Sequence, residues 1–174
     1  MKLIEKSLIV LCLMTTNCIA QTPELKEQFI NSVYQTFVDS SFTQYYLTDD
    51  CSRLWLSSPK IKDDFAPFCP DSIFQKIFLK SETDTLTETW QCHNLKNSKC
   101  ISLDLKYSFV RNKTLPQEKK VYTFSKPIFS DNYEYAVIEM SYFCGPKCAY
   151  GCTFLFKKIN SRWQKVAETN CWAS

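Results

Sequence analysis

The sequence predicts an α+β domain in which N-terminal helices pack on a curved antiparallel meander of five to six strands that disulfides staple together. Three observations lead to this prediction. Apolar residues recur at helical spacing near the N-terminus, they recur at every second position in the C-terminal half, and the chain contains ten cysteines. Helices followed by a run of sequential strands are typical of α+β domains and not of parallel α/β sheets.

Residues 1–20 are interpreted as a secretory signal peptide. Lys2 and Lys6 precede a short apolar run, and small residues come before a polar stretch, which is the usual order in such signals. The apolar run is shorter than the roughly 20 residues that a membrane-spanning helix needs. Cleavage after Ala20 leaves residues 21–174 as one domain, for which we expect a secreted, periplasmic or cell-envelope location.

A lipoprotein is the alternative that this N-terminus leaves open. Cleavage just before Cys18 would make that cysteine the lipidated residue. A lipidation site normally follows a small residue, but Asn17 stands there, so plain export is favoured.

Charge and glycine content narrow the classes of function. The formal net charge is +3, and loss of two lysines and one glutamate with residues 1–20 would make it +2. This weak, mixed charge argues against a nucleic-acid partner, which requires clustered Lys and Arg. Only two glycines occur in the whole chain, which argues against phosphate-binding loops and hence against a nucleotide cofactor. No cofactor is predicted.

Two helices are predicted in the first half of the chain. Thr22 to about Ser40 carries an apolar stripe at helical spacing and opens with a capping residue, a proline and a glutamate, which suit a helix start. A second helix is expected from about Asp71 to Ser81. Between them, a short helical turn is expected over Ser52–Leu56, and prolines interrupt the chain repeatedly.

The second half alternates with a period of two. Cys100–Val110 shows the clearest alternation of apolar and polar residues, as expected for a strand with one buried face. Turns are expected at Ser130–Asn132 and Asn160–Ser161. The other predicted strands are Thr85–Gln91, Lys120–Ser125, Tyr135–Phe143, Cys152–Ile159 and Trp163 to about Cys171.

Eight cysteines remain after the signal peptide, and an even number in an exported chain predicts a disulfide framework. Cys144 and Cys152 would face each other across a hairpin. A turn at Asn160–Ser161 places Tyr150 opposite Cys171, which makes the nearby Cys148 its expected partner. The hypothesised pairs are Cys144–Cys152, Cys148–Cys171, Cys92–Cys100, which would close a polar loop, and Cys51–Cys69, which would staple the proline-rich segment.

A metal site is the alternative reading of the cysteines. Cys144, Cys148 and Cys152 are regularly spaced, and the Cys92–His93 dipeptide together with Cys100 offers further ligands. Zinc sites favour closer cysteine pairs and reducing compartments, so disulfides are preferred and no metal is predicted.

Candidate catalytic residues are few. His93 is the only histidine and lies in a polar loop, so a Ser–His or Cys–His hydrolase would have to use it as base. Carboxylates are plentiful, but nothing in their spacing selects a glycosidase pair. Asp49–Asp50, Asp63–Asp64 and Asp131 are assigned to turns and helix starts, and no catalytic residue is predicted.

Aromatic residues in or beside predicted loops are candidates for stacking on sugars or on a protein partner, although at least half are expected to be packing residues. These candidates are Tyr45, Tyr46, Trp55, Tyr133, Tyr150 and Trp172.

The C-terminal segment YFCGPKCAYGCTFLFKKINSRWQKV, preceded by FSKPIFSD at Phe124, resembles the end of small uncharacterised exported proteins of Bacteroidetes-type bacteria. The resemblance covers about the last 50 residues, implies a secreted or envelope protein and carries no activity. The order of the elements is similar to that of the nuclear-transport-factor-2-like and cystatin-like folds, and such a similarity does not fix a function.

These observations predict an exported, non-enzymatic binding domain. Its partner would be a protein, a glycan or an envelope component, and an inhibitor or immunity protein is one form of it. A secreted hydrolase that uses His93 or a carboxylate pair, and a structural envelope component, are the alternatives. The oligomeric state is left open.

Overall fold

The computed structural model describes residues 23–38, 45–54, 56–84, 88–102, 120–145 and 147–174. The predicted signal peptide and Trp55 lie outside the described residues, as does most of the strand predicted over Cys100–Val110. In the described part of the chain, no helix is both long and apolar enough to cross a membrane.

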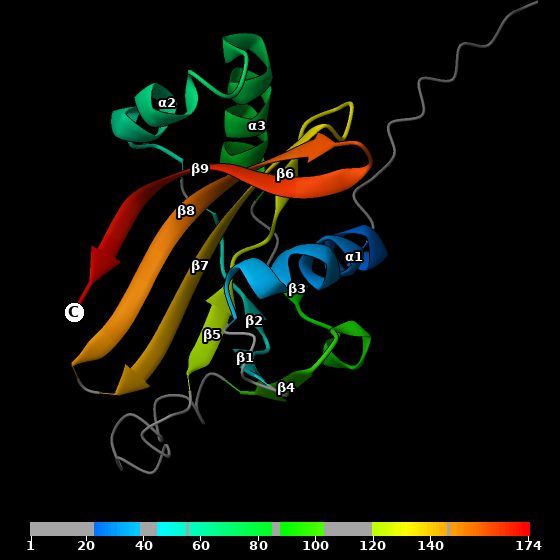
Figure 1. Cartoon of the computed structure of the whole chain (residues 1–174), viewed down its shortest axis with the longest axis vertical. Helices are drawn as coiled ribbons and strands as arrows, with labels where there is room; N and C mark the ends of the chain where they lie inside the picture. Colours follow the sequence, from blue (N-terminus) through cyan, green and yellow to red (C-terminus); the bar gives the residue numbers. More distant parts are fainter. Residues whose placement is uncertain (1–22, 39–44, 55, 85–87, 103–119, 146) are drawn as a thin grey trace, which may run out of the picture.

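The described residues form an α+β structure, as predicted. Seven strands make one sheet in the order β4-β1-β5-β7-β8-β9, with β6 paired to β7, and β2 and β3 form a separate small ribbon (Figure 1). The strands are β1 Tyr45–Thr48, β2 Asp50–Cys51, β3 Glu88–Thr89, β4 Ser98–Ile101, β5 Val121–Phe124, β6 Ile128–Phe129, β7 Tyr135–Gly145, β8 Cys148–Ile159 and β9 Arg162–Ala173.

The sheet has more strands than the sequence predicted and is mixed. Strands β5, β7, β8 and β9 are antiparallel neighbours, as expected for a meander. Strand β1 adds to β5 in parallel, and β4 adds to β1 in parallel. Parallel neighbours are joined by long connections and not by tight turns. The pairing of β1 with β4 and β5 therefore could not be predicted from turn residues in the sequence.

The helices differ from the prediction at three places. Helix α1 spans Pro23–Val33 and passes into a 3-10 turn, η1 Tyr34–Thr36, before the expected end near Ser40. Helix α3, Asp71–Thr83, matches the prediction. Helix α2, Pro59–Phe65, was missed because Pro59 was read as a chain break, whereas proline is well tolerated at the first position of a helix. Residues 52–54 are not helical.

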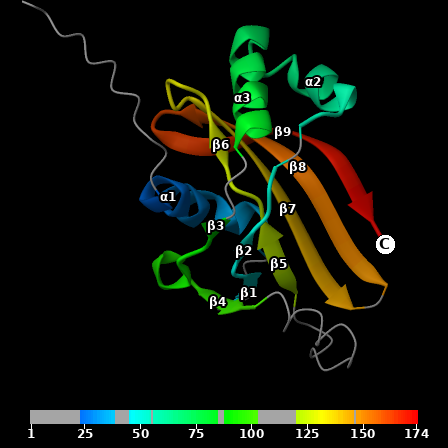
Figure 2. The ribbon, with the colours of Figure 1, turned by 180° about the vertical axis from the view of Figure 1, so that it is seen from behind.

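The two faces of the sheet bury two separate cores. On β7, Ala136 and Ile138 belong to the core that contains α1, while Val137 belongs to the core that contains α2 and α3. On β8, Phe154 and Leu155 divide in the same way, because successive side chains of a strand point to opposite faces. Figures 1 and 2 show α1 on one side of these strands and α3 on the opposite side.

Three disulfides are present in the described residues. Cys92–Cys100 is the predicted pair, and its Cα atoms lie 5.9 Å apart. It closes the loop that carries the short 3-10 helix η2, Cys92–Asn94.

The predicted Cys144–Cys152 pair is wrong, because the β7–β8 hairpin is tighter than the sequence suggested. The strands continue to Gly145 and Cys148, and Met140 lies opposite Cys152. Cys144 is instead bonded to Cys148 across the turn, with the Cα atoms 5.1 Å apart.

The predicted Cys148–Cys171 pair is also wrong, and two β-bulges explain why. Beside the Asn160–Ser161 turn the register is as expected, but it shifts by one residue after Phe156 and again after Thr153. Each bulge inserts an extra residue into β9. The position opposite Cys171 therefore moves from Tyr150 to Cys152, and the structure pairs Cys152 with Cys171, Cα atoms 4.2 Å apart.

The predicted Cys51–Cys69 pair does not form. Both cysteines are free and buried. Cys51 belongs to the core on the α1 side and Cys69 to the core on the α2 and α3 side. The sheet separates them, so the proline-rich segment is held by packing and not by a disulfide.

Candidate functional site

The structure does not gather the candidate aromatic residues into one surface. Tyr45 is 3% exposed and is a core residue. Tyr46 is half-buried beside the sheet edge. Tyr150 stacks on Tyr142 near the tip of the β7–β8 hairpin, with ring centroids 5.5 Å apart. Tyr133 lies at the other end of the molecule, beside a groove described below.

Trp172 is 47% exposed but has a local packing role. It lies opposite Gly151 in the β8–β9 pairing. A Cβ atom at Gly151 would come within 2.6 Å of the indole ring, so the indole covers the space above the glycine.

The polar candidates of the sequence do not meet at one site. His93 is exposed in η2. Asp131 forms ion pairs with Lys76 and Lys80, and hydrogen bonds from Lys80 hold the pKa of its carboxyl below the ordinary value. Asp64 of α2 accepts a hydrogen bond from the Thr169 hydroxyl. These carboxylates connect helices to turns and strands.

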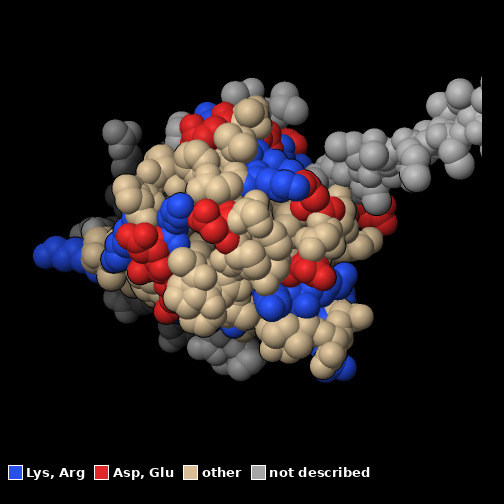
Figure 3. Space-filling model, turned by 90° about the horizontal axis from the view of Figure 1, so that it is seen from above, with Lys and Arg blue, Asp and Glu red and all other residues tan. Residues whose placement is uncertain are grey.

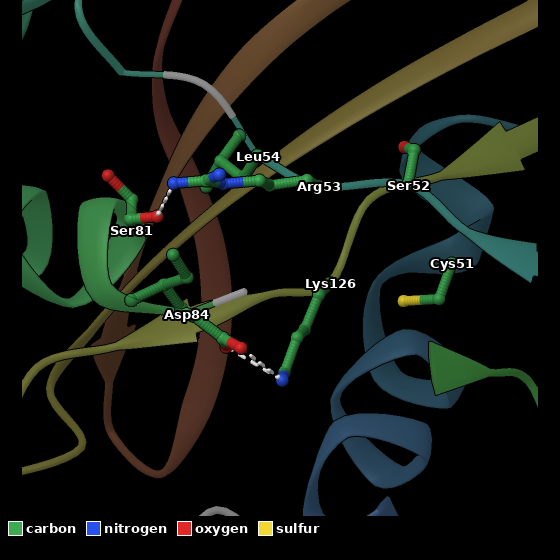
Figure 4. Close-up of a pocket in the computed structure, with 8 residues that line it drawn as sticks. Cys51, Ser52, Arg53, Leu54, Ser81, Asp84 and Lys126 are labelled. Carbon is green, nitrogen blue, oxygen red and sulfur yellow. Dashed lines mark hydrogen bonds and ion pairs between the residues drawn. The ribbon is translucent and has the colours of Figure 1, made fainter. Parts of the chain in front are cut away.

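A cluster of four charged side chains lies where α1, β3, the end of α3 and the β5–β6 connection meet. Lys26 contacts Glu88 at 2.6 Å, and its side chain is only 4% exposed. Lys126 contacts Glu88 as well and reaches Asp84 at 2.7 Å. Figure 4 shows Lys126 and Asp84 pointing toward one another from different segments.

The electrostatics of this cluster are those of a structural junction. Desolvation lowers the pKa of Lys26, and its hydrogen bond with Glu88 only partly offsets that effect. Burial works against ionisation of Glu88 too, but hydrogen bonds from Lys126 and Lys26 outweigh it, so the pKa of Glu88 is lowered. The two positive and two negative charges balance, which leaves no net charge to attract a ligand.

A small cavity beside the cluster has room for about one water molecule. Its volume is ≈ 10 Å³, and its lining includes Cys51, Arg53 and Lys126 (Figure 4). Arg53 donates to the carbonyl oxygens of Ser81 and Glu82 at the end of α3. Desolvation raises the pKa of Cys51 to about 12. A thiol that stays protonated is a poor nucleophile, so this cavity does not suit nucleophilic catalysis.

The larger concave feature is a groove of ≈ 420 Å³ between α1 and two turns, one from β6 to β7 and one from β8 to β9. This volume lies within the range of small-molecule sites. Phe29 and Phe129 are nearly fully buried and form its floor. The lining residues are Leu25, Gln28, Phe29, Ser32, Phe129, Tyr133, Lys158, Ser161 and Trp163.

The floor of the groove is a set of interlocked rings. The Phe29 ring meets Phe129 edge-on at 5.3 Å and Trp163 edge-on at 5.1 Å between centroids. The Lys158 ammonium lies 5.7 Å from the Trp163 ring centroid. Edge-to-face contacts fix ring orientation, so the aromatic lining is held in place before any ligand arrives.

Both turns that border the groove contain unusual backbone conformations. Tyr133 has φ 54°, and Asn160 and Ser161 have φ 49° and 62°. Two successive positive values suit a tight hairpin turn, but a positive φ is costly for a bulky residue such as tyrosine. Residues held in such conformations cluster at functional sites.

Sequence reasoning missed most of this groove. It singled out Tyr133, but it read Phe29 only as part of a helix stripe and Trp163 only as the start of a strand. The lining comes from three separate segments of the chain, residues 25–32, 129–133 and 158–163. The one local feature of the sequence that could have indicated the groove was the polar Asn160–Ser161 turn between Lys158 and Trp163.

The described residues contain no group of three or more His, Cys, Asp or Glu side chains that is arranged to hold a metal ion. Cys144, Cys148 and Cys152, the cysteines of the alternative metal reading, are all in disulfides. Comparisons with known protein families, with curated proteins and with solved structures found no match for this chain.

Proposed function

We propose that this chain is an exported, non-enzymatic binding domain whose ligand occupies the groove between α1 and the two turns. The observation that carries the proposal is the preformed aromatic floor with polar side chains at its rim. Small-molecule sites are typically concave and largely apolar, with a few polar groups that fix orientation. Phe29, Phe129 and Trp163 supply the apolar part, and Gln28 and Ser161 supply polar groups.

We assign an acidic saccharide as the ligand class. Aromatic rings with polar groups nearby suit ligands that have both an apolar surface and a hydrated, polar surface. A sugar is such a ligand, because it presents C–H groups on its faces and hydroxyls on its edges. Lys158 is the charged residue among the described residues that line the groove. Its ammonium favours a carboxylate on the sugar.

Two further observations support this function without deciding it. Disulfides are typical of proteins outside the reducing cytosol, and the described residues contain three of them. On the face shown in Figure 3, Lys and Arg are interspersed with Asp and Glu and do not form one basic patch, which is unlike a nucleic-acid-binding surface.

Calorimetric titration with digalacturonic acid and with neutral galactobiose tests the proposal. We expect the acidic disaccharide to bind more tightly, and Lys158→Gln to weaken its binding about tenfold while galactobiose is unaffected, because one charge-assisted contact is lost. Lys157→Gln is the matched control, since Lys157 lies on the opposite face of β8, near the Tyr135 ring. The control should bind like the parent chain.

Other outcomes would contradict the acidic saccharide as the ligand. Equal loss in the Lys158 and Lys157 variants, or absence of heat with both disaccharides, would contradict a saccharide groove. A complex with an exported protein that persists in Lys158→Gln would favour the inhibitor form of a binding domain over the glycan form.

A further inference from the structure

The Cys144–Cys148 disulfide lies at the tip of the β7–β8 hairpin and is the most accessible of the three. Cys148 is exposed and Cys144 is half-buried. In the Cys152–Cys171 disulfide Cys171 is exposed, but Cys152 is 1% exposed, and the Tyr150 hydroxyl lies 2.8 Å from the Cys152 sulfur. Both cysteines of the Cys92–Cys100 disulfide are half-buried. An external thiol can therefore reach the Cys148 sulfur without any part of the sheet opening.

The hairpin holds these two cysteines together independently of their bond. Tyr142 pairs with Tyr150 and Gly145 with Cys148 in the strand register, and the two tyrosine rings stack. The Cys144 sulfur lies 3.2 Å from the Cys148 carbonyl oxygen, which can accept a hydrogen bond from a reduced thiol. The Cα separation of 5.1 Å, already suitable for a disulfide, is thus set by the backbone.

This disulfide also has the weakest structural role. The cysteines are 4 residues apart in sequence, against 8 for Cys92–Cys100 and 19 for Cys152–Cys171. Stabilisation by a cross-link grows with the length of the loop that it closes in the unfolded chain. Opening the shortest loop releases the least chain entropy, so the fold tolerates reduction here best.

We propose that Cys144–Cys148 is a reversible thiol–disulfide exchange site for low-molecular-weight thiols. A thiolate attacks the Cys148 sulfur, the bond between the two cysteines breaks, and Cys144 leaves as a thiolate that takes up a proton. A second thiolate then attacks the external sulfur of the mixed disulfide and releases Cys148. Two thiols become one disulfide, and the protein disulfide gains two electrons and two protons. The positive charge of the exposed Lys147, the chain neighbour of Cys148, attracts the incoming thiolate.

Timed reduction of the exported chain with glutathione, followed by alkylation and peptide mass mapping, tests this site. We expect Cys144 and Cys148 to be labelled at least tenfold faster than Cys92, Cys100, Cys152 or Cys171. The buried free thiol of Cys51 is the internal control, because its labelling reports unfolding. Simultaneous labelling of all three disulfides, or labelling of Cys144 and Cys148 only together with Cys51, would overturn the proposal.

Single variants identify the cysteine that carries the mixed disulfide. With oxidised glutathione, Cys144→Ser should form a mixed disulfide at Cys148 at least fivefold faster than Cys148→Ser forms one at Cys144. Lys147→Gln should slow reduction of the parent disulfide two- to threefold, whereas Lys157→Gln should not change it. Equal rates in the two serine variants would contradict Cys148 as the carrier of the mixed disulfide. If the serine variants do not fold, the labelling order in the unaltered chain still decides the proposal.

Discussion

At the scale of single residues, Glu88 is the carboxylate that joins Lys26 to Lys126. It accepts contacts from both Lys26 and Lys126, and Lys26 is almost completely removed from water. A buried lysine without a carboxylate partner is strongly unfavourable, because its desolvation is no longer offset. The junction between α1, β3 and the β5–β6 connection therefore depends on one carboxylate.

Glu88→Gln should lower the free energy of unfolding by about 3 kcal/mol at pH 7, since Lys26 loses its partner and Lys126 keeps only Asp84. The pKa of Glu88 is lowered in the folded chain. Its stabilising effect is therefore complete above the pKa of the unfolded carboxyl, about 4.3, and is lost as the pH falls through the folded value. Urea unfolding from pH 7 down to pH 3 should show the difference between variant and parent shrinking below about pH 4.

Glu82→Gln is the matched control, because Glu82 is exposed at the end of α3. It should change stability by less than about 0.5 kcal/mol at any pH in that range. A pH-independent loss in Glu88→Gln, or a similar loss in Glu82→Gln, would show that the carboxylate charge of Glu88 is not what holds the junction.

At the scale of elements, the register of β9 on β8 depends on two bulges. They move Cys171 opposite Cys152 and Trp172 opposite Gly151. Asn170, with φ 53°, lies in the second bulge, and a residue in the left-handed region is a usual component of such irregularities. The disulfide and the indole–glycine contact then fix the shifted register.

Gly151→Ala should destabilise the chain by about 1 kcal/mol, because the added methyl meets the Trp172 indole and forces the ring away. In a Trp172→Ala background the same change should cost nothing or be slightly stabilising, because alanine restricts the unfolded chain more than glycine does. Urea unfolding of the four chains gives the coupling energy between the two positions, expected at about 1 kcal/mol or more. Additive effects would mean that the indole does not cover Gly151.

The sequence predicted those elements that depend on a local pattern, such as helical spacing of apolar residues or a turn dipeptide. Helix α3 followed from the spacing of Phe74 and Ile77, and the β8–β9 turn followed from Asn160–Ser161. The pairing of β1 with β4 and β5 is non-local and leaves no such signal.

The cysteine pairing failed for a different physical reason. A register counted from a turn is right only until the first bulge, and each bulge of β9 moved the expected partner by one residue. The Cys148–Cys171 pair was wrong for this reason, although both hairpins were predicted. The Cys144–Cys152 pair was wrong because the β7–β8 hairpin is tighter than expected, and the Cys51–Cys69 pair was wrong because the sheet separates the two cysteines. The groove was missed because its rings come from segments that only the folded chain brings together.

At the scale of the whole molecule, one sheet separates two cores and leaves its two ends chemically different. One end carries the groove with its aromatic floor and Lys158. The other end, at the hairpin tip, carries the exposed Cys144–Cys148 disulfide. The long strands β7 and β8 connect the two ends and keep them apart, so ligand binding and thiol exchange are expected to be independent.

The most direct test of the groove is a nuclear magnetic resonance titration of ¹⁵N-labelled chain with digalacturonic acid up to about 10 mM, a range that detects weak binding. We expect shifts at the indole N–H of Trp163 and at the backbone amides of Gln28 and Ser161, and unchanged signals at Tyr150 and Trp172. An unchanged spectrum, or shifts confined to the hairpin tip, would contradict the groove as the binding site.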